Sequence, residues 1–561
     1  MTKGAAESPR DSQALLKVGS GARIALACLP WSAIALIAVW LLGVTFVCTA
    51  AGDLPFDAAY NFLAYKNIVD RGAYELQYGA TVQPFDPIAS TGPTVNLPIL
   101  FYYWWSGVPD AIYRGTAWTN VAYVAFFLAG FCYLAWRISR NSWLVAASLL
   151  LFVYLVYVTP PLVMRETLFS GLGEHFAVVF LFFGTFLIWS GRTLPTFFAG
   201  MLCLGLALLT KINAVAGFGL PLVWLAVFGR KRLPQSSSRV RLGLITLGAM
   251  ALLLAPKLLH SRILPSLLLE GSSRSTYSEP HQNWENGVSK LALYNWRLFE
   301  RGVKYGHKEH WQKLAENLRE KLVTWDSMKG GWRHASGILL LFLASMAFLW
   351  RCRRPETDSL FYLGLFGLSF GSWWFLLNHS TIYRYLAMGD LAASIVVAMA
   401  LPLFAQQVWA QSKGFGPRPS LLILGGLGYS LFVAWPRLNE LDYRPYFANT
   451  RLRQAALAHF VDEIESLPND ALCFGFGWFQ APEVRAVANV RFASLLEKED
   501  VMAALDSKKP LYFVASISLT ETIPTYREKV LPLSAHVIYD REGYALYAID
   551  PKELSEAQPW L

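Results

Sequence analysis

Two acidic residues follow the first long apolar segment of the chain, in the stretch GDLPFDAAYN that begins at Gly52. Asp53 and Asp57 stand where the chain leaves an apolar environment, and a carboxylate there loses part of its hydration. A partly desolvated carboxylate is a better proton acceptor, so either residue is a candidate general base acting on a hydroxyl group. Both could instead cap a helix at a wet interface, and spacing alone favours that interpretation.

Three other short segments place charged residues beside apolar runs. They are MRETLFSGLGEH with Arg165, Glu166, Glu174 and His175, LLTKIN with Lys211, and NHSTIYRYLAMGD with His379, Arg384 and Asp390. Arginine and lysine stabilise the charge that develops on a phosphate leaving group, more strongly in a low dielectric. For any single residue, a local ion pair or a side chain that reaches the membrane surface is an equally good explanation. The set as a whole favours a phosphate-handling site.

The composition indicates what surrounds these residues. Of 561 residues, 54% are hydrophobic and only 16% are charged, against about 25% charged in soluble domains. The mean hydropathy is +0.35. Apolar stretches long enough to cross a membrane recur over most of the chain. The sequence therefore predicts a polytopic α-helical membrane protein with about eleven transmembrane helices, at residues 24–50, 115–136, 141–158, 175–190, 195–210, 213–229, 242–259, 335–350, 359–377, 386–405 and 420–435.

Basic residues of the short connections fall on one side of this arrangement. They account for most of the formal net charge of +10 and include Arg137, Arg140, Arg192 and Arg351. Because connections rich in lysine and arginine stay in the cytoplasm, we expect residues 1–23 to form a cytoplasmic tail. The end of the chain then lies outside. No basic and aromatic stripe indicates a nucleic-acid partner.

The first large loop, residues 52–114, faces outward in this topology. Residues 57–71 have a helical apolar pattern, with Ala58, Phe62, Tyr65 and Val69 on one face, which predicts an amphipathic helix on the membrane surface. Residues 91–107 are apolar and aromatic, but two prolines interrupt them, which favours an interfacial helix over a full span. Within it, Tyr102, Tyr103, Trp104 and Trp105 could stack on sugars, although membrane anchoring is the favoured role.

Two further regions face outward. The loop 260–334 is polar and aromatic, with a helical stretch near 308–323. Residues 436–561 alternate between helical and strand patterns, with strands expected at 471–476, 511–516, 535–540 and 543–549. The sequence therefore predicts a membrane domain over residues 24–435, followed by a small soluble α/β domain over 436–561.

In their order along residues 24–435, these segments resemble the GT-C superfamily of membrane glycosyltransferases, which includes the lipid A aminoarabinose transferases and the protein O-mannosyltransferases. DAAYN at 57–61 is similar to the acidic motif of the family's first loop, which maps to Asp57. FDPIASTGPTVNLP at 85–98 resembles the segment that leads to the second surface helix. GLALLTKIN at 205–213 and YRYLAMGD at 383–390 resemble motifs that map to Lys211 and Arg384.

The resemblance implies transfer of a sugar, with inversion, from a polyprenyl-phosphate carrier to a lipid, glycan or protein acceptor outside the cytoplasm. Asp57 is then the general base, and Lys211, Arg384 and Arg165 hold the donor phosphate. Candidates for orienting the acceptor or carrying a divalent metal are Asp53, Glu174, Glu166 and His379. Whether a metal takes part stays open at this point. The implied location is the bacterial inner membrane, with the active site and the C-terminal domain in the periplasm.

Two other functions compete with this one. A transporter or flippase of glycolipids would place paired ionisable groups near the middle of the bilayer, whereas the charges of this chain gather at the outer boundary. A non-catalytic envelope assembly protein would use its C-terminal domain to bind a partner. Residues 436–561 show no catalytic constellation of their own, which is compatible with that function.

Overall fold

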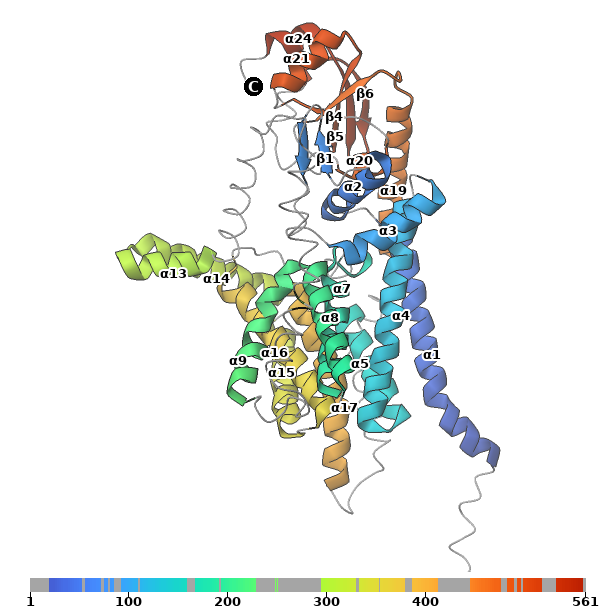
Figure 1. Cartoon of the computed structure of the whole chain (residues 1–561), viewed down its shortest axis with the longest axis vertical. Helices are drawn as coiled ribbons and strands as arrows, with labels where there is room; N and C mark the ends of the chain where they lie inside the picture. Colours follow the sequence, from blue (N-terminus) through green and yellow to red (C-terminus); the bar gives the residue numbers. More distant parts are fainter. Residues whose placement is uncertain are drawn as a thin grey trace, which may run out of the picture.

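The structure is a computed structural model of the whole chain, drawn in Figure 1. It describes residues 20–52, 56–71, 75–78, 81–84, 92–108, 111–158, 167–190, 193–228, 248, 250, 294–328, 332–352, 354–378, 386–411, 444–475, 482–488, 492–495, 498–516 and 531–557. The described parts form a bundle of apolar helices and, at one end of it, a unit built around a sheet (Figure 1).

Four helices of the bundle are long and apolar enough to cross a membrane: α1 (Ser20–Ala50), α4 (Ala111–Ser139), α16 (Pro355–Leu376) and α17 (Ala387–Gln411). Shorter apolar helices pack with them, namely α5 (Ser142–Val153) with its π-helical extension η2 (Tyr154–Val158), α7 (Glu174–Ser190), α8 (Leu194–Thr210), η3 (Ile212–Phe218) with α9 (Gly219–Phe228), and α15 (Trp332–Cys352). One large apolar cluster, drawn from most of these helices, forms the core of the bundle.

These helices lie where nine of the eleven spans were predicted. The other two predicted spans, 242–259 apart from residues 248 and 250, and 420–435, fall outside the described residues. The count of eleven therefore stays a prediction, while the helical membrane architecture is confirmed.

Local residue chemistry sets the turns of the bundle. Arg140 has a positive φ of 52°, which stops α4. Asn141 then starts α5, because its side chain accepts a hydrogen bond of 2.9 Å from the Trp143 amide. At the start of α8, Thr193 and Thr196 form a reciprocal capping box. Such caps satisfy backbone groups that a helix end leaves without partners.

Helices α7 and α8 run unusually close together. A methyl group added at Gly184 would come within 3.1 Å of the Gly200 carbonyl oxygen, and one at Gly200 within 3.0 Å of the Gly184 carbonyl oxygen. Small residues of this kind let apolar helices approach at their backbones. The close crossing brings together the sheet-facing ends of α7 and α8, where Glu174 and Lys211 lie.

The unit at the end of the bundle contains a five-stranded sheet of order β4-β3-β5-β7-β6. Its elements are α19 (Arg444–Glu465), β3 (Leu472–Gly475), α20 (Pro482–Val487), β4 (Phe492–Ser494), α21 (Lys498–Ser507), β5 (Leu511–Ser516), η8 (Leu531–Leu533), β6 (Ser534–Arg541), β7 (Tyr544–Ile549) and α24 (Pro551–Glu556). Strands β4, β3 and β5 are parallel, and β7 is antiparallel to β5 and β6. The four predicted strands are confirmed, whereas β4 was not predicted.

The first loop contributes helix α2 (Phe56–Arg71), a small hairpin of β1 (Glu75–Tyr78) and β2 (Thr81–Pro84), and helix α3 (Pro93–Ser106). Helices were predicted at both places, and the hairpin was not. The expected membrane-surface position of α2 is wrong. Helix α2 lies between α3 and α20, and its residues Ala58, Ala59 and 61–67 are all buried. Apolar residues of the C-terminal unit share one buried cluster with the side of α2 that was expected to face the membrane. Figure 1 shows α20 beside α2.

The loop before α15 forms helices α13 (Tyr294–Tyr305) and α14 (Lys308–Met328). The second of these confirms the helical stretch expected near 308–323. The two helices make a hairpin that projects sideways from the bundle (Figure 1).

Gly92 gives a direct test of how α3 is fixed to the bundle. Its amide donates to the Thr210 carbonyl at 2.8 Å, and a Cβ at this position would overlap the Leu209 carbonyl oxygen. We expect Gly92→Ala to lower stability by about 1–3 kcal/mol or more, because backbone atoms must move apart. The shift of the thermal unfolding midpoint of the purified protein measures this effect.

Gly43→Ala is the matched control for that substitution. Gly43 lies in α1 with no atom near its missing side chain. Alanine there gains helix propensity of up to about 1 kcal/mol, so the midpoint should stay or rise. Equal midpoints for the two variants would show that the Gly92 contact is not a tight one.

Candidate active site

The structure describes three of the eight candidate site residues. Asp57 lies in the first turn of α2, Glu174 begins α7, and Lys211 follows the last residue of α8. All three lie at the end of the bundle that faces the sheet. The remaining candidates, Asp53, Arg165, Glu166, His379 and Arg384, fall outside the described residues.

Lys211 is a buried cation at a break between helices. Its backbone is extended, which ends α8 before η3 begins. The residue is 7% exposed. Its Nζ atom donates to the Leu172 carbonyl oxygen at 3.0 Å and lies 3.4 Å from Oε1 of Glu174. The chain therefore turns at Lys211, between the predicted spans 195–210 and 213–229. Its ammonium group has an acidic neighbour in Glu174.

Glu174 is the anionic partner, and it is 2% exposed. Its position as the first residue of α7 places the carboxylate at the positive end of the helix dipole. Burial of either charge alone would be costly, because neither has water around it. The pair therefore depends on both members being present.

A buried polar network lies beside this pair. His175 Nε2 is 3.0 Å from Asn120 Oδ1, and Asn120 Nδ2 donates to Thr49 Oγ1 at 3.0 Å. Because an amide oxygen only accepts, Nε2 carries the ring hydrogen in this arrangement. Sequence reasoning missed Asn120 and Thr49. A polar amide inside the apolar run 115–136 was the available signal, since such residues are costly in a span unless they are bonded.

The start of α3 is fixed beside Lys211. Besides the Gly92 amide bond, the hydroxyl oxygens of Thr94 and Thr210 lie 2.6 Å apart. Tyr123 of α4 donates to the Thr94 carbonyl at 3.0 Å. These bonds join α3, α4 and α8 at the end of the bundle.

The far part of α3 is joined to α2 by a second cluster. Lys66 Nζ is 2.9 Å from Asp70 Oδ2, and Tyr103 donates to Asp70 Oδ1 at 3.1 Å. Burial, together with the Asp70 carboxylate, raises the pKa of Tyr103 to about 12. The phenol therefore keeps its hydrogen at neutral pH. Asp57 begins the same helix, so α3 links the helix of Asp57 to the end of α8 and Lys211.

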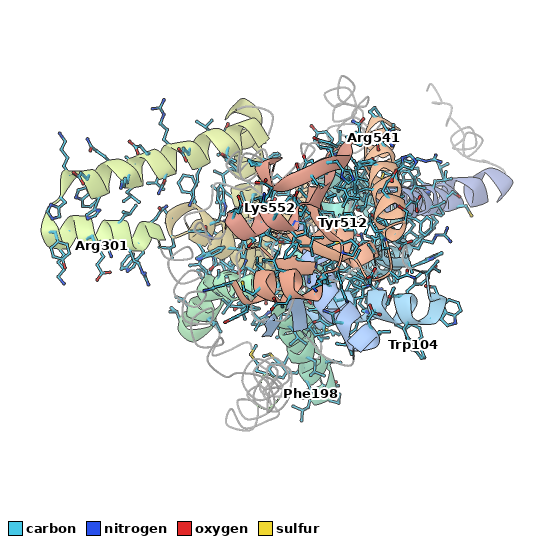
Figure 2. The ribbon with its side chains drawn as sticks, turned by 90° about the horizontal axis from the view of Figure 1, so that it is seen from above. Trp104, Phe198, Arg301, Tyr512, Arg541 and Lys552 are labelled. Atoms are coloured by element: carbon cyan, nitrogen blue, oxygen red, sulfur yellow. The ribbon has the colours of Figure 1, made fainter. Side chains whose placement is uncertain are left out.

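The exposed aromatic residues of α3 point away from this region. Trp104 and Trp105 are exposed, and Figure 2 shows Trp104 at the outer edge of the molecule. This arrangement fits anchoring at the membrane surface, the favoured interpretation of these residues, better than sugar stacking.

Comparison with solved structures identifies the fold. The chain is similar to the crystal structure of ArnT from Cupriavidus metallidurans in the apo state, with a TM-score of 0.55 and 15% identity over 94% of this chain and 99% of that chain. ArnT is a lipid A aminoarabinose transferase of the GT-C superfamily. The Archaeoglobus fulgidus oligosaccharyltransferase in the apo form gives a TM-score of 0.48 and 13% identity over 93% of this chain and 74% of that chain. The lower score does not establish a shared fold.

No protein-family model and no curated protein sequence matches the chain. The likeness to ArnT nevertheless covers nearly the whole of both chains, so the chain shares the fold of that structure. Its long apolar helices indicate an integral membrane protein. The resemblance found in the sequence is confirmed at the level of the fold. At this identity, the likeness leaves the activity to be argued from the site.

A double-mutant cycle tests the Lys211–Glu174 pair. Removing one partner from a buried pair typically costs about 3–5 kcal/mol, because the other charge is left uncompensated. We expect Lys211→Met and Glu174→Gln each to lower the thermal unfolding midpoint. The double variant should be more stable than the Lys211→Met single variant. Additive losses would show that the two charges do not depend on each other.

Proposed function

We propose that the chain is a membrane glycosyltransferase that transfers a sugar from a polyprenyl-phosphate carrier to a lipid, glycan or protein acceptor outside the cytoplasm. The observation that carries this proposal is the likeness to ArnT over 94% of the chain. Asp57, Glu174 and Lys211 lie at the end of the bundle that faces the sheet. A carboxylate and a cation at a lipid boundary are the groups that such a transfer needs.

In the proposed reaction, Asp57 accepts the proton of an acceptor hydroxyl group. The hydroxyl oxygen attacks the anomeric carbon of the donor sugar from the side opposite the carrier. The bond from that carbon to the phosphate oxygen breaks, its electron pair leaves with polyprenyl phosphate, and the anomeric configuration inverts. One feature of Asp57 supports this role. Its carboxyl group is partly exposed in the first turn of α2, so it is not shut off from an acceptor hydroxyl group.

The proposed phosphate-binding cations are Lys211, Arg165 and Arg384. Lys211 directly follows the last residue of the apolar helix α8. Its ammonium group is paired with Glu174, so a donor phosphate has to share or displace that carboxylate. Cations in a low-dielectric site stabilise a developing phosphate charge strongly.

The proposed orientation places the sheet unit outside the cytoplasm, in the periplasm of a bacterium whose inner membrane holds the bundle. Arg137, Arg140, Arg351 and Arg354 stand at the opposite end of the bundle, where α4 and α15 end and α5 and α16 begin. Basic connections of this kind stay in the cytoplasm.

A divalent metal was a further candidate, with Glu174 among its ligands. The Lys211 ammonium lies 3.4 Å from Oε1 of Glu174, and a metal bound there would have to displace it. Among the described residues there is no group of three or more His, Cys, Asp or Glu side chains arranged to hold a metal. The other metal candidates, Asp53, Glu166 and His379, fall outside the described residues, so a role for a metal stays a prediction.

The location of charge favours a transferase over a glycolipid transporter. In the described parts of the apolar helices, Asp, Glu, Lys and Arg residues occur only in the first or last turn. A transporter typically places ionisable groups near the middle of the bilayer, at interrupted helices. The described residues show no such arrangement.

Replacing the proposed base tests the reaction. We expect Asp57→Asn to lower glycosyl transfer by about 10²–10⁴-fold, because an amide cannot accept the proton. The assay uses reconstituted protein with a panel of labelled polyprenyl-phosphate sugars. Asp462→Asn, at an exposed carboxylate of α19, is the matched control and should keep full activity. Activity retained by Asp57→Asn would exclude Asp57 as the base. Folded wild-type protein that neither binds nor turns over any donor would contradict the transferase proposal.

Competition between Glu174 and the donor phosphate gives a second test. If Lys211 binds phosphate, Glu174→Gln should bind polyprenyl phosphate several-fold more tightly, because a competing carboxylate is removed. Adding Lys211→Gln to that variant should reverse the gain, with two neutral side chains in place of the pair. Equilibrium binding of labelled polyprenyl phosphate to the purified variants measures both effects. Equal affinity in all three proteins would remove Lys211 from the phosphate site.

A further inference from the structure

Helices α13 and α14 form a hairpin that reaches sideways from the bundle (Figure 1). The two helices are joined by a tight turn in which Gly306 has a positive φ of 66°. A hydrogen bond of 3.1 Å from Asn317 Nδ2 to Asn295 Oδ1 ties them together, and Trp311 packs against Gly302. The function proposed above makes no use of this hairpin.

One flat side of the hairpin is apolar and exposed. On α13 the exposed residues Trp296, Phe299 and Val303 follow the spacing of one helix face. Asn295, Leu298 and Gly302 are buried, and they occupy a neighbouring face. Trp311 of α14 continues the exposed side, with its ring centroid 5.6 Å from that of Phe299. We call Trp296, Phe299, Val303 and Trp311 the aromatic face.

Both helices of the hairpin are fixed to the end of a membrane span. The Lys321 side chain of α14 is fully buried, and its Nζ atom donates to the Trp374 carbonyl at 2.6 Å and also to the Phe375 and Asn378 carbonyls. These carbonyls close the C-terminal end of α16, where a cation is favoured. The Asn295 amide of α13 donates to the Leu377 carbonyl at 3.2 Å. The hairpin is therefore held at the level where α16 ends.

Surface that faces lipid continues directly into the hairpin. After α14 the chain enters the apolar helix α15, on which Leu340 and Leu343 are exposed. Leu322 and Val323, near the end of α14, are exposed as well. On the other side of the bundle, α3 carries its own exposed tryptophans. Figure 2 shows Trp104 of α3 and Arg301 of α13 at opposite edges of the molecule.

We propose that the α13–α14 hairpin lies on the outer leaflet of the membrane, with the aromatic face in the headgroup region and the lipid bilayer as its partner. Tryptophan and other aromatic residues favour this boundary, and an amphipathic helix binds it along its length. Charge complementarity supports the same occupant, because Arg297, Arg301 and Lys304 outnumber Glu300 on α13 and match lipid phosphates. With α3 on the opposite side, the bundle has a membrane-surface element at each edge. The proposal does not depend on the enzymatic activity.

Photo-crosslinking to lipid tests this placement. A benzophenone amino acid replaces Val303 on the aromatic face or, as the control, Asp462 of α19, which is also exposed and lies outside the hairpin. The protein is reconstituted in nanodiscs of phosphatidylcholine and phosphatidylglycerol, irradiated and analysed by mass spectrometry. We expect several-fold more lipid adduct at position 303 than at position 462. Equal adducts at both positions, or none at 303, would overturn the proposal. A crosslinked dimer formed from 303 would show that a second copy of the chain covers this face, which would also overturn it.

A second variant tests the aromatic face itself. Replacing Trp296 and Phe299 with serine, in the protein that carries the probe at 303, should lower the lipid adduct several-fold. Both side chains are exposed, so the thermal unfolding midpoint should hardly change. An unchanged adduct yield in the folded variant would show that the aromatic face does not hold the hairpin on the leaflet.

Discussion

A buried ion pair at the end of an apolar bundle is the constraint around which the candidate site is arranged. Lys211 and Glu174 come from the facing ends of α8 and α7, with 3.4 Å between the ammonium nitrogen and one carboxylate oxygen. Neither charge can be buried by itself at an acceptable cost, so the two helix ends must stay together. The close backbone crossing at Gly184 and Gly200 makes that approach possible.

From this pair, polar contacts extend to the two helices of the first loop, α3 and α2. The backbone of Thr210 binds Gly92 at the start of α3, and Tyr103 near the end of α3 binds Asp70 of α2. Helix α2 is covered in turn by the C-terminal unit through α20. The position of Asp57 is thus set by a succession of packed elements rather than by the lipid surface. Asp57, the proposed general base, and Lys211, the proposed phosphate-binding cation, are therefore held by one connected set of packed elements.

The same end of the bundle also holds the two elements that we propose to lie at the membrane surface. Lys321 fixes α14 on the last carbonyls of α16, and α3 rests on the ends of α4 and α8. Both elements carry exposed aromatic residues at opposite edges of the molecule.

The sequence alone determined the features that depend on neighbouring residues. Hydropathy located the apolar helices, and alternating residues located β3, β5, β6 and β7, because both patterns repeat within a few residues. It also singled out Glu174 and Lys211, whose charges stand out beside apolar runs. The short strand β4 and the β1–β2 hairpin were not predicted, because so few residues give little periodic pattern.

Only the tertiary structure decided which residues meet. The pairing of Lys211 with Glu174, the Thr49–Asn120–His175 network and the burial of α2 all join segments far apart in the chain. The periodicity of α2 looked like that of a helix half immersed in a membrane. An apolar pattern in the sequence indicates only that these side chains are removed from water. Whether lipid or another part of the protein covers them depends on packing across the fold.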